Sequence, residues 1–300
     1  IIATFSRKKV FGYKMMLYTA VATGVLSFFV WAHHQFVAGI DPRMANVFTV
    51  TTLLISVPIA ELLFVIIATL YGGSIRLTTP MLWALAFMAE FLIGGVTGIF
   101  LGASGADIYF HDTYFVLAHF HYTFFPIAII GSFAAFTYWF PKMFGKMMDE
   151  RLGKIHFWGT VITITLTFTG QMMVGYAGQQ RRLWDPYQYA YIKNLQDLNV
   201  GTSFAAFAMF AFQFAFIWNF CASMWRGKQA EKNPWNVGTL EWTLSSPPPN
   251  YNFKVVPHVH WGPHEFSNPV LMEALGRDFV MQDEIVPGFN DEGEKMPLPE

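Results

Sequence analysis

Two pairs of histidines lie inside long apolar stretches of the sequence. His33 and His34 are adjacent, and His119 and His121 flank Phe120. Ionisable side chains are costly inside a membrane, so each of these histidines is a candidate functional residue. Neutral imidazole is also a favoured ligand of copper, iron and zinc. The two pairs therefore indicate sites at which histidines bind metal ions or metal-containing cofactors.

The spacing within each pair points to different chemistry. Adjacent histidines such as His33 and His34 can bind one metal where a helix ends and the backbone turns both rings together; a pair wetted by lipid headgroups explains them equally well. His119 and His121 lie about 200° apart around a helix axis, so they face nearly opposite sides. Haem iron accepts an axial histidine, so one helix could bind two haems. The alternative is a hydrogen-bonded core pair, which needs polar partners on both sides of the helix.

A pair of arginines could bind the acidic groups of such cofactors. Arg181 and Arg182 are adjacent in a polar segment that follows an apolar stretch. Guanidinium groups bind carboxylates through two hydrogen bonds, and haem propionates are carboxylates. A solvated loop pair is the simpler explanation when the two arginines are considered alone.

The overall composition indicates a protein that lies in lipid. The 300 residues are 54% hydrophobic, 18% aromatic and 13% charged, whereas soluble domains carry about 25% charged residues. The net charge of -1 shows no basic excess of the kind found in nucleic-acid-binding domains, so no nucleic-acid partner is expected. Cys221 is the one cysteine, which excludes an internal disulfide framework and a cysteine-based zinc or iron–sulfur site.

Six apolar stretches are long enough to cross a membrane, which takes about 20 helical residues. They cover residues 13–32, 47–71, 80–101, 115–140, 157–177 and 202–225. Their length, and their lack of apolar–polar alternation, argue against a β-barrel. We therefore predict an all-α, polytopic transmembrane helix bundle over residues 1–226, with neighbouring helices antiparallel. An irregular, extended cytoplasmic tail is expected over residues 227–300.

Basic residues predict the orientation of the bundle, because cytoplasmic loops carry an excess of lysine and arginine. Twelve of these residues lie beside the span ends on one side and four on the other. The larger group is Arg7, Lys8, Lys9, Lys14, Arg76, Lys142, Lys146, Arg151, Lys154, Arg226, Lys228 and Lys232, and the smaller is Arg43, Arg181, Arg182 and Lys193. Both chain ends are thus expected in the cytoplasm. The chain begins at Ile1 rather than Met, and we interpret it as a fragment or one product of a divided polypeptide.

Five motifs occur in order along the chain. They are Arg7-Lys8-Lys9-x-Phe11-Gly12-Tyr13-Lys14, Trp31-x-His33-His34-x-Phe36, His111-Asp112-Thr113-Tyr114 followed by Ala118-His119-Phe120-His121-Tyr122, Arg181-Arg182, and Leu240-Glu241-Trp242-Thr243-Leu244-Ser245-Ser246-Pro247-Pro248-Pro249. Together they resemble subunit I of the haem–copper oxidases, most closely that of the cytochrome c oxidases. The similarity extends from Ile1 to about Pro249 and matches the last six of the family's twelve core helices.

The resemblance implies a role for each histidine. His33 and His34 match two of the three ligands of the active-site copper. His119 matches the axial ligand of the high-spin haem that faces this copper, and His121 matches one of two axial ligands of the low-spin haem; Phe120 lies between the haems. In the family, the third copper ligand, a tyrosine linked to it, the second ligand of the low-spin haem and the acid of the main proton channel precede the matched region. The chain is therefore expected to act with the N-terminal half of subunit I or an equivalent chain.

The resemblance also implies further sites and partners. His111 and Asp112 match a magnesium site, and Arg181 and Arg182 match residues that contact haem propionates. The expected cofactors are two a-type haems, one high-spin and one low-spin, an active-site copper and Mg²⁺. The expected partners are subunit II, which carries a copper or cytochrome c site for electron entry, other membrane oxidase subunits and cytochrome c. The implied function is that of a terminal respiratory oxidase in the inner or plasma membrane of a prokaryote, which reduces O₂ to water with electrons from cytochrome c and takes up protons.

The chain departs from the family in a span that normally carries a proton channel. Ile59 and Leu62 replace the threonine and lysine of the usual Val-Pro-Thr-Gly-x-Lys pattern. Glu61 occurs beside the lysine position, and Glu90 occurs in the next span, where an apolar residue is usual. We predict that at least one of these glutamates belongs to a replacement proton path, with Glu61 the first candidate. A protonated, hydrogen-bonded structural glutamate is the alternative.

Two other functions stay open. Residues 175–180 lack the Met-Pro that usually precedes the arginine pair. Such drift occurs among relatives that reduce nitric oxide, which use membrane glutamates and often non-haem iron. One alternative is therefore a nitric oxide reductase on an oxidase-like scaffold, with iron in place of copper. The other is a non-catalytic membrane subunit, although histidines without ligands would be expensive in lipid.

Overall fold

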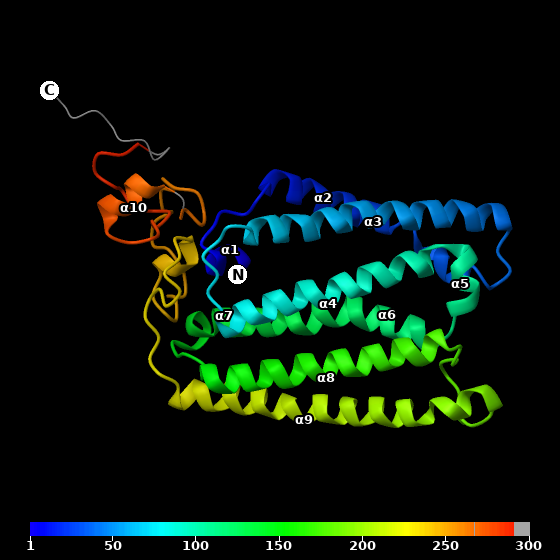
Figure 1. The fold of residues 1–300 in the computed structure, drawn as a ribbon. Coiled ribbons are helices and arrows are strands. Elements are labelled where there is room, and N and C mark those ends of the chain that lie inside the picture. Colours follow the sequence, from blue (N-terminus) through cyan, green and yellow to red (C-terminus); the bar gives the residue numbers. More distant parts are fainter. Residues whose placement is uncertain (267, 291–300) are drawn as a thin grey trace.

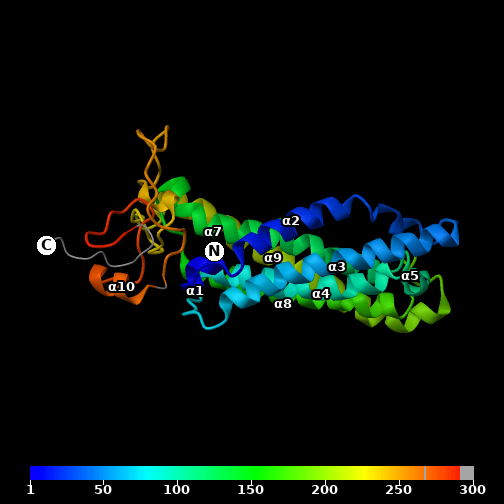
Figure 2. The same ribbon diagram turned by 90° about the horizontal axis from the view of Figure 1, so that it is seen from above.

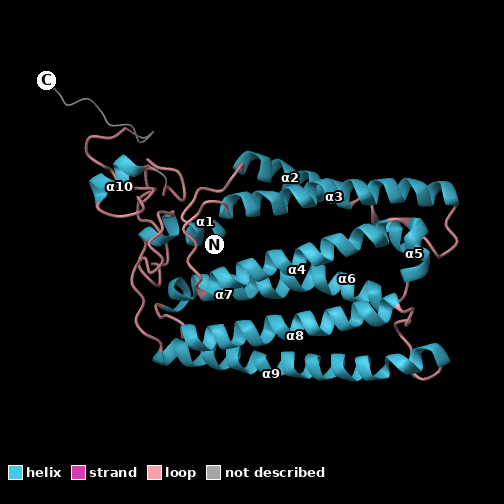
Figure 3. Ribbon diagram, in the orientation of Figure 1, coloured by secondary structure: helices cyan, strands magenta, loops and turns pink. Residues whose placement is uncertain are grey.

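The computed structural model describes residues 1–266 and 268–290 of the chain. These residues form helices joined by loops, with two isolated β-bridges and no strand, as Figure 1 and Figure 3 show. In chain order the helices are α1 (Ile2–Ser6), α2 (Tyr13–Ser27), η1 (Trp31–Gln35), α3 (Pro42–Leu70), α4 (Thr79–Gly102), α5 (Ser104–Phe110), α6 (Tyr114–Phe125), η2 (Pro126–Ile130), α7 (Gly131–Phe144), α8 (Glu150–Tyr176), η3 (Ala190–Leu195), α9 (Gln196–Arg226), η4 (Leu240–Thr243) and α10 (Pro269–Leu275). The η1, η3 and η4 segments are 3₁₀-helices, and η2 is a π-helix.

Six helical stretches are long and apolar enough to cross a membrane, as the sequence predicts. They are Tyr13–Gln35, Pro42–Leu70, Thr79–Gly102, Tyr114–Phe144, Glu150–Tyr176 and Ala190–Arg226. The last stretch begins earlier than predicted, because η3 leads directly into the polar first turn of α9. The prediction of an all-α transmembrane bundle is thus confirmed.

The long helices run side by side (Figure 1). Helix α8 packs against α9 on one side and against α6 and α4 on the other. Helices α2 and α3 pack on each other at the edge of the molecule, and α3 connects this pair to α4, an arrangement that can also be followed in Figure 2. Helix α6, which carries His119 and His121, is therefore held between α4 and α8.

The packed core lies among α4, α6, η2, α7 and α8. Its buried residues are Leu82, Trp83, Ala86, Tyr122, Ile130, Ala134, Phe157, Ile164 and Phe168. In the most apolar part of α8 half of the residues are buried, whereas in the equivalent part of α9 none is. The apolar side chains of α9 that do not pack on the core thus point outward, which carries no penalty in a bilayer because lipid tails are as apolar as leucine.

Two of the spans are interrupted near residues singled out from the sequence. In the first, α2 ends at Ser27 and the histidine pair lies in the 3₁₀ segment η1. In the fourth, Pro126 follows α6 directly and begins the π-helix η2. Proline has no N–H to complete a helical hydrogen bond, which accounts for the change of helix type at this point.

The N-terminal segment and the described part of the tail meet at one end of the bundle. Arg7 donates to the carbonyl oxygens of Trp235 (3.1 Å) and Asn236, and Lys9 pairs with Glu265. The tail also has a small apolar cluster of its own, formed by Trp261, Leu271, Val280 and Val286. The described tail is therefore folded against the bundle. The division of the chain after residue 226 and the cytoplasmic location of this end stay predictions.

Candidate functional site

His33 and His34 face each other at the end of the first span. Their Nε2 atoms are 3.1 Å apart, and Nδ1 of His33 is 3.3 Å from the hydroxyl of Thr52 on α3. Two imidazole nitrogens that bind one metal at about 2.0–2.1 Å, at roughly a right angle, lie about 3 Å apart. The separation therefore suits two ligands of one metal, and it also suits a hydrogen bond between neutral rings. Among the described residues, no group of three or more His, Cys, Asp or Glu side chains could hold a metal.

His119 is held by α4 through one ring nitrogen. Its Nδ1 lies 3.0 Å from the carbonyl oxygen of Gly94 and 3.1 Å from the hydroxyl of Thr97. A carbonyl oxygen can only accept, so Nδ1 carries the hydrogen and Nε2 keeps a lone pair. Histidines that bind metals commonly donate their other N–H in this way, which fixes the orientation of the ring. A Cβ atom at Gly98 would lie 2.8 Å from Cε1 of the ring, so the absence of a side chain at Gly98 makes room for His119.

His121 is oriented in the same way but lies against a different helix. Its Nδ1 is 2.7 Å from the carbonyl oxygen of Leu117, one turn earlier in α6. The ring stacks on Phe120, with centroids 4.2 Å apart, and lies 4.9 Å from the ring of Phe168 on α8. Within the described chain, neither His119 nor His121 makes a hydrogen bond through Nε2. One helix thus presents two oriented imidazoles to different neighbours.

The η1 pair and His119 occupy one neighbourhood. The three imidazoles are close enough that a positive charge on one would repel a charge on another. The sequence separates His34 from His119 by three helices, so only the packing of α3 and α4 brings them together. The donor set available there consists of imidazole nitrogens, which suits copper or iron better than a hard cation.

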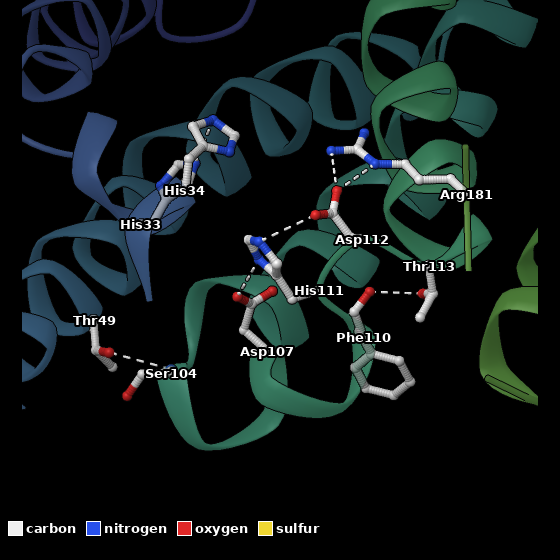
Figure 4. Close-up of polar contacts among 10 residues, drawn as sticks. All are labelled: His33, His34, Thr49, Ser104, Asp107, Phe110, His111, Asp112, Thr113 and Arg181. Atoms are coloured by element: carbon white, nitrogen blue, oxygen red, sulfur yellow. Dashed lines mark hydrogen bonds and ion pairs between the residues drawn. The ribbon is translucent and has the colours of Figure 1, made fainter. Parts of the chain in front are cut away.

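A polar cluster of Asp107, His111, Asp112 and Arg181, here called the loop cluster, lies beside this neighbourhood (Figure 4). Arg181 donates from Nε (2.8 Å) and Nη2 (2.7 Å) to Oδ1 of Asp112. His111 lies with Nδ1 3.1 Å from Oδ2 of Asp107 and Nε2 3.8 Å from Oδ2 of Asp112. The hydrogen bond from Arg181 lowers the pKa of Asp112, whereas burial raises the pKa of Asp107.

Local backbone structure explains how distant parts of the chain form the loop cluster. Asp112 has a left-handed φ of 56°, and Thr113 then caps α6 by accepting a hydrogen bond from the N–H of Phe115 at 3.2 Å. The backbone N–H of Arg181 donates to the carbonyl oxygen of Asp112 at 2.8 Å, and Thr113 forms a β-bridge with Gln180. The loops before α6 and after α8 are therefore joined by main-chain contacts.

The structure brings together three of the four residues predicted for this region. Arg182 is exposed and makes no hydrogen bond or ion pair with the described residues, although its charge is near enough to stabilise that of Asp112. Asp107 belongs to the cluster and was missed from the sequence. The signal that could have found it is the four-residue spacing to His111, which brings the residue directly after α5 back to a side chain one turn earlier in that helix.

The two glutamates lie in different surroundings. Glu90 on α4 is 4% exposed, and its Oε1 is 2.8 Å from the hydroxyl of Thr165 on α8. Glu61 on α3 is half-buried and makes no hydrogen bond or ion pair with the described residues. Within the described chain, neither Thr69 nor Thr97 forms a hydrogen bond with Glu61. Both hydroxyls are used elsewhere, because Thr69 bonds the backbone of its own helix and Thr97 bonds its own helix and His119.

Comparison with known proteins identifies a family. Residues 1–208 match the family model described as cytochrome c and quinol oxidase polypeptide I. Over 285 residues the chain is 39% identical to cytochrome c oxidase subunit 1 of Thermostichus vulcanus, covering 94% of this chain and 50% of that protein. It is 44% identical over 260 residues to cytochrome c oxidase subunit 1 of Cereibacter sphaeroides (86% and 45%). It is 41% identical over 262 residues to quinol oxidase subunit 1 of Bacillus subtilis strain 168 (86% and 40%).

The chain spans about half the length of the curated relatives it matches. Its fold also resembles a chain of a heme–copper terminal oxidase dimer solved by cryo-electron microscopy, with a TM-score of 0.58 and 22% sequence identity. That match covers 69% of this chain and 41% of the other. The chain therefore belongs to the cytochrome c and quinol oxidase polypeptide I family, transmembrane oxidoreductases of the respiratory chain in which haem and copper are the typical cofactors.

Proposed function

We propose that this chain is part of the catalytic subunit of a terminal respiratory oxidase that reduces O₂ to water with electrons from cytochrome c and takes up protons. One observation carries the proposal. His119 and His121 are both fixed through Nδ1 by backbone carbonyl oxygens, so both direct Nε2 away from their own anchors and toward different sides of α6. A purely structural histidine has no need for this arrangement, whereas an axial ligand of haem does.

In this proposal His33 and His34 hold the copper, His119 holds the high-spin haem and His121 holds the low-spin haem. These groups supply one-electron transfer and the binding of O₂ when they are present. The contribution of the chain is to orient the ligands. The Gly94 carbonyl fixes the tautomer of His119 and makes its Nε2 more basic, and the ring of Phe120 stacks on that of His121.

The loop cluster is proposed to bind groups at the edge of the haems. Asp112 and His111 present an oxygen and a nitrogen to a common space, and a carboxylate oxygen is a suitable ligand of Mg²⁺. Arg181 uses two of its five N–H donors on Asp112, so three are available for haem propionates. Exposed Arg182 adds positive charge on the same side.

The proposed centres need other chains. Two imidazoles do not complete a copper site, and one imidazole does not complete a six-coordinate low-spin haem. We therefore propose the N-terminal half of subunit I, or an equivalent chain, as an obligatory partner, together with subunit II, other membrane subunits and cytochrome c. The proposed location is the plasma membrane of a prokaryote with both ends of this chain in the cytoplasm. The support is that both described ends lie at one end of the bundle (Figure 1).

A second candidate function is the reduction of nitric oxide with iron in place of copper. The observation that favours it is the buried carboxyl of Glu90 in a span where an apolar residue is usual. A non-catalytic membrane subunit is the third reading.

The test is a visible spectrum of the purified complex, followed by measurement of O₂ and nitric oxide consumption. We expect signals of two haems and uptake of O₂. Consumption of nitric oxide without uptake of O₂ would support the second function, and a haem-free complex would support the third.

A further inference from the structure

A buried carboxyl group lies where α4, α6 and α8 meet. Glu90 is 4% exposed, and among the described residues no lysine, arginine or histidine forms an ion pair with it. Its Oε2 atom is buried and has no hydrogen-bond partner within the described chain. An ionised carboxylate in such a place is far more costly than a neutral acid, because the one hydroxyl beside Oε1 replaces only a small part of the lost hydration of the charge.

The hydrogen atoms around Thr165 also favour a neutral acid. The hydroxyl oxygen of Thr165 is 2.8 Å from Oε1 of Glu90 and 2.9 Å from the carbonyl oxygen of Val161. A hydroxyl has one hydrogen to donate, and a backbone carbonyl can only accept. If Thr165 donates to Val161, its contact with Glu90 is a hydrogen bond only when the carboxyl group is protonated and donates. A neutral Glu90 therefore satisfies both contacts without any rearrangement.

The same threonine connects Glu90 to the helix that carries the histidines. The hydroxyl of Tyr122 on α6 lies 3.3 Å from the carbonyl oxygen of Thr165 and 2.7 Å from the hydroxyl of Thr169. Tyr122 is fully buried and directly follows His121. The carboxyl group and α6 thus contact the same residue of α8, Glu90 at the hydroxyl of Thr165 and Tyr122 at its backbone carbonyl, so a movement of α6 can reach Glu90 through one shared residue.

We propose that Glu90 is an exchangeable-proton site, with its carboxyl group protonated at rest and deprotonated and reprotonated as the groups bound to α6 change oxidation state. This inference rests on the proposed function. The O–H bond of the carboxylic acid breaks, its proton passes to a water molecule, and a later proton from water restores the acid; no electron moves at Glu90. Glu61 shares none of these features, since it is half-buried and bonds to no described residue.

The experiment is redox-difference infrared spectroscopy of the purified complex in H₂O and D₂O. A protonated carboxyl group gives a C=O stretching band that shifts in D₂O. We expect such a band in the wild type, its loss in Glu90→Gln and its retention in Glu61→Gln, which is the matched control. Thr165→Val should move the band to higher frequency by removing its hydrogen-bond partner, and Thr165→Ser should restore it.

The visible spectrum separates the two possible failures. A wild-type complex without haem signals would overturn the proposed function, and with it the premise of this experiment. A complex with normal haem signals whose band survives Glu90→Gln, or which shows no such band, would overturn the inference alone. Turnover of Glu90→Gln should fall by about 100-fold, at the lower end of what a positioned proton donor contributes.

Discussion

Two polar parts of the molecule, the interface of the tail with the bundle and the histidine region, are built on different principles. Where the tail meets the bundle, polar atoms bond one another. The ammonium of Lys142 contacts the carbonyl oxygens of Lys232 (3.1 Å), Leu244 (2.5 Å) and Ser245 (3.2 Å), and Nε1 of Trp242 donates to the hydroxyl of Tyr138 at 3.0 Å. This chain alone supplies both sides of every one of these contacts.

In the histidine region of α6 and η1, the described chain supplies a hydrogen-bond partner to only some of the imidazole nitrogens. One nitrogen of each α6 histidine is bonded to a backbone carbonyl, and the other has no hydrogen bond within the described residues. His33 and His34 direct one nitrogen each toward a shared point. A tail interface of this kind stabilises a fold, whereas oriented imidazoles with one nitrogen still available suit the cofactor binding that we propose for them. Mutations in the first region should therefore affect stability, and mutations in the second should affect cofactor content.

The largest expected effect is at the α6 histidines. His121→Ala should abolish the low-spin haem signal and turnover, while binding of carbon monoxide at the other haem is partly kept. His119→Ala should remove carbon monoxide binding, because the two rings face different sides of the helix. Reduced-minus-oxidised and carbon monoxide difference spectra measure both. Two variants with unchanged haem spectra would show that these histidines are structural.

A smaller effect is expected when the anchor of His119 is disturbed and the histidine itself is kept. A Cβ at Gly98 would lie 2.8 Å from Cε1 of His119, so Gly98→Ala should push the imidazole away from the Gly94 carbonyl. Loss of such supporting contacts typically costs about 10–100-fold in metal affinity or activity. Haem content and turnover are the measurements. Gly95→Ala is the control, because a Cβ there has nothing within 4 Å, and it should behave as the wild type.

At the tail interface, Lys142→Met should lower stability and leave the haem spectrum unchanged. The substitution leaves carbonyl oxygens of the tail without a donor, at a cost of about 1–3 kcal/mol. Thermal unfolding of the purified complex measures the loss. Lys228→Met, at an exposed position, is the control and should have no measurable effect. A changed haem spectrum in Lys142→Met would contradict the separation of the two regions.

The smallest effect concerns pH. Burial lowers the pKa of His264 from 6.5 to about 4 in the folded protein, where its Nε2 lies 3.3 Å from the hydroxyl of Thr4. Folding therefore favours the neutral ring. The stability that His264 contributes to the folded tail is complete above about pH 6.5 and is lost as the pH falls toward 4. Limited proteolysis of the tail should accelerate over this range in the wild type. In His264→Gln the rate should no longer depend on this titration, and an unchanged dependence would assign the effect to another group.

The sequence predicts the spans and the directions of the α6 histidines well. Apolar runs of about 20 residues have to be helical in a bilayer, because every backbone polar group must be bonded within its own segment. The angle between His119 and His121 follows from the helical repeat alone. Adjacent histidines that bind one metal require the helix to end beside them, and the first span does change from α-helix to the 3₁₀ segment η1 at His33 and His34.

The contacts between helices could not be predicted in this way. The sequence favours Glu61 over Glu90, yet Glu90 is the glutamate enclosed between α4 and α8. It treats Arg181 and Arg182 as equivalent, yet only Arg181 pairs with Asp112. Its only signal for Asp107 is the four-residue spacing to His111, which by itself does not show that the two side chains pair.

These contacts could not be predicted because the spans lie in lipid rather than in water. In a water-soluble helix, polarity distinguishes the inner face from the outer face, but the spans of this chain are apolar all round, since lipid and protein interior are similar environments. The amino-acid sequence by itself therefore determined that the chain is a six-span bundle, and it singled out four histidines that we propose as metal ligands. Which face of each helix meets which neighbour, and so which acid is buried and which arginine is paired, was decided only by the packing of one helix against another.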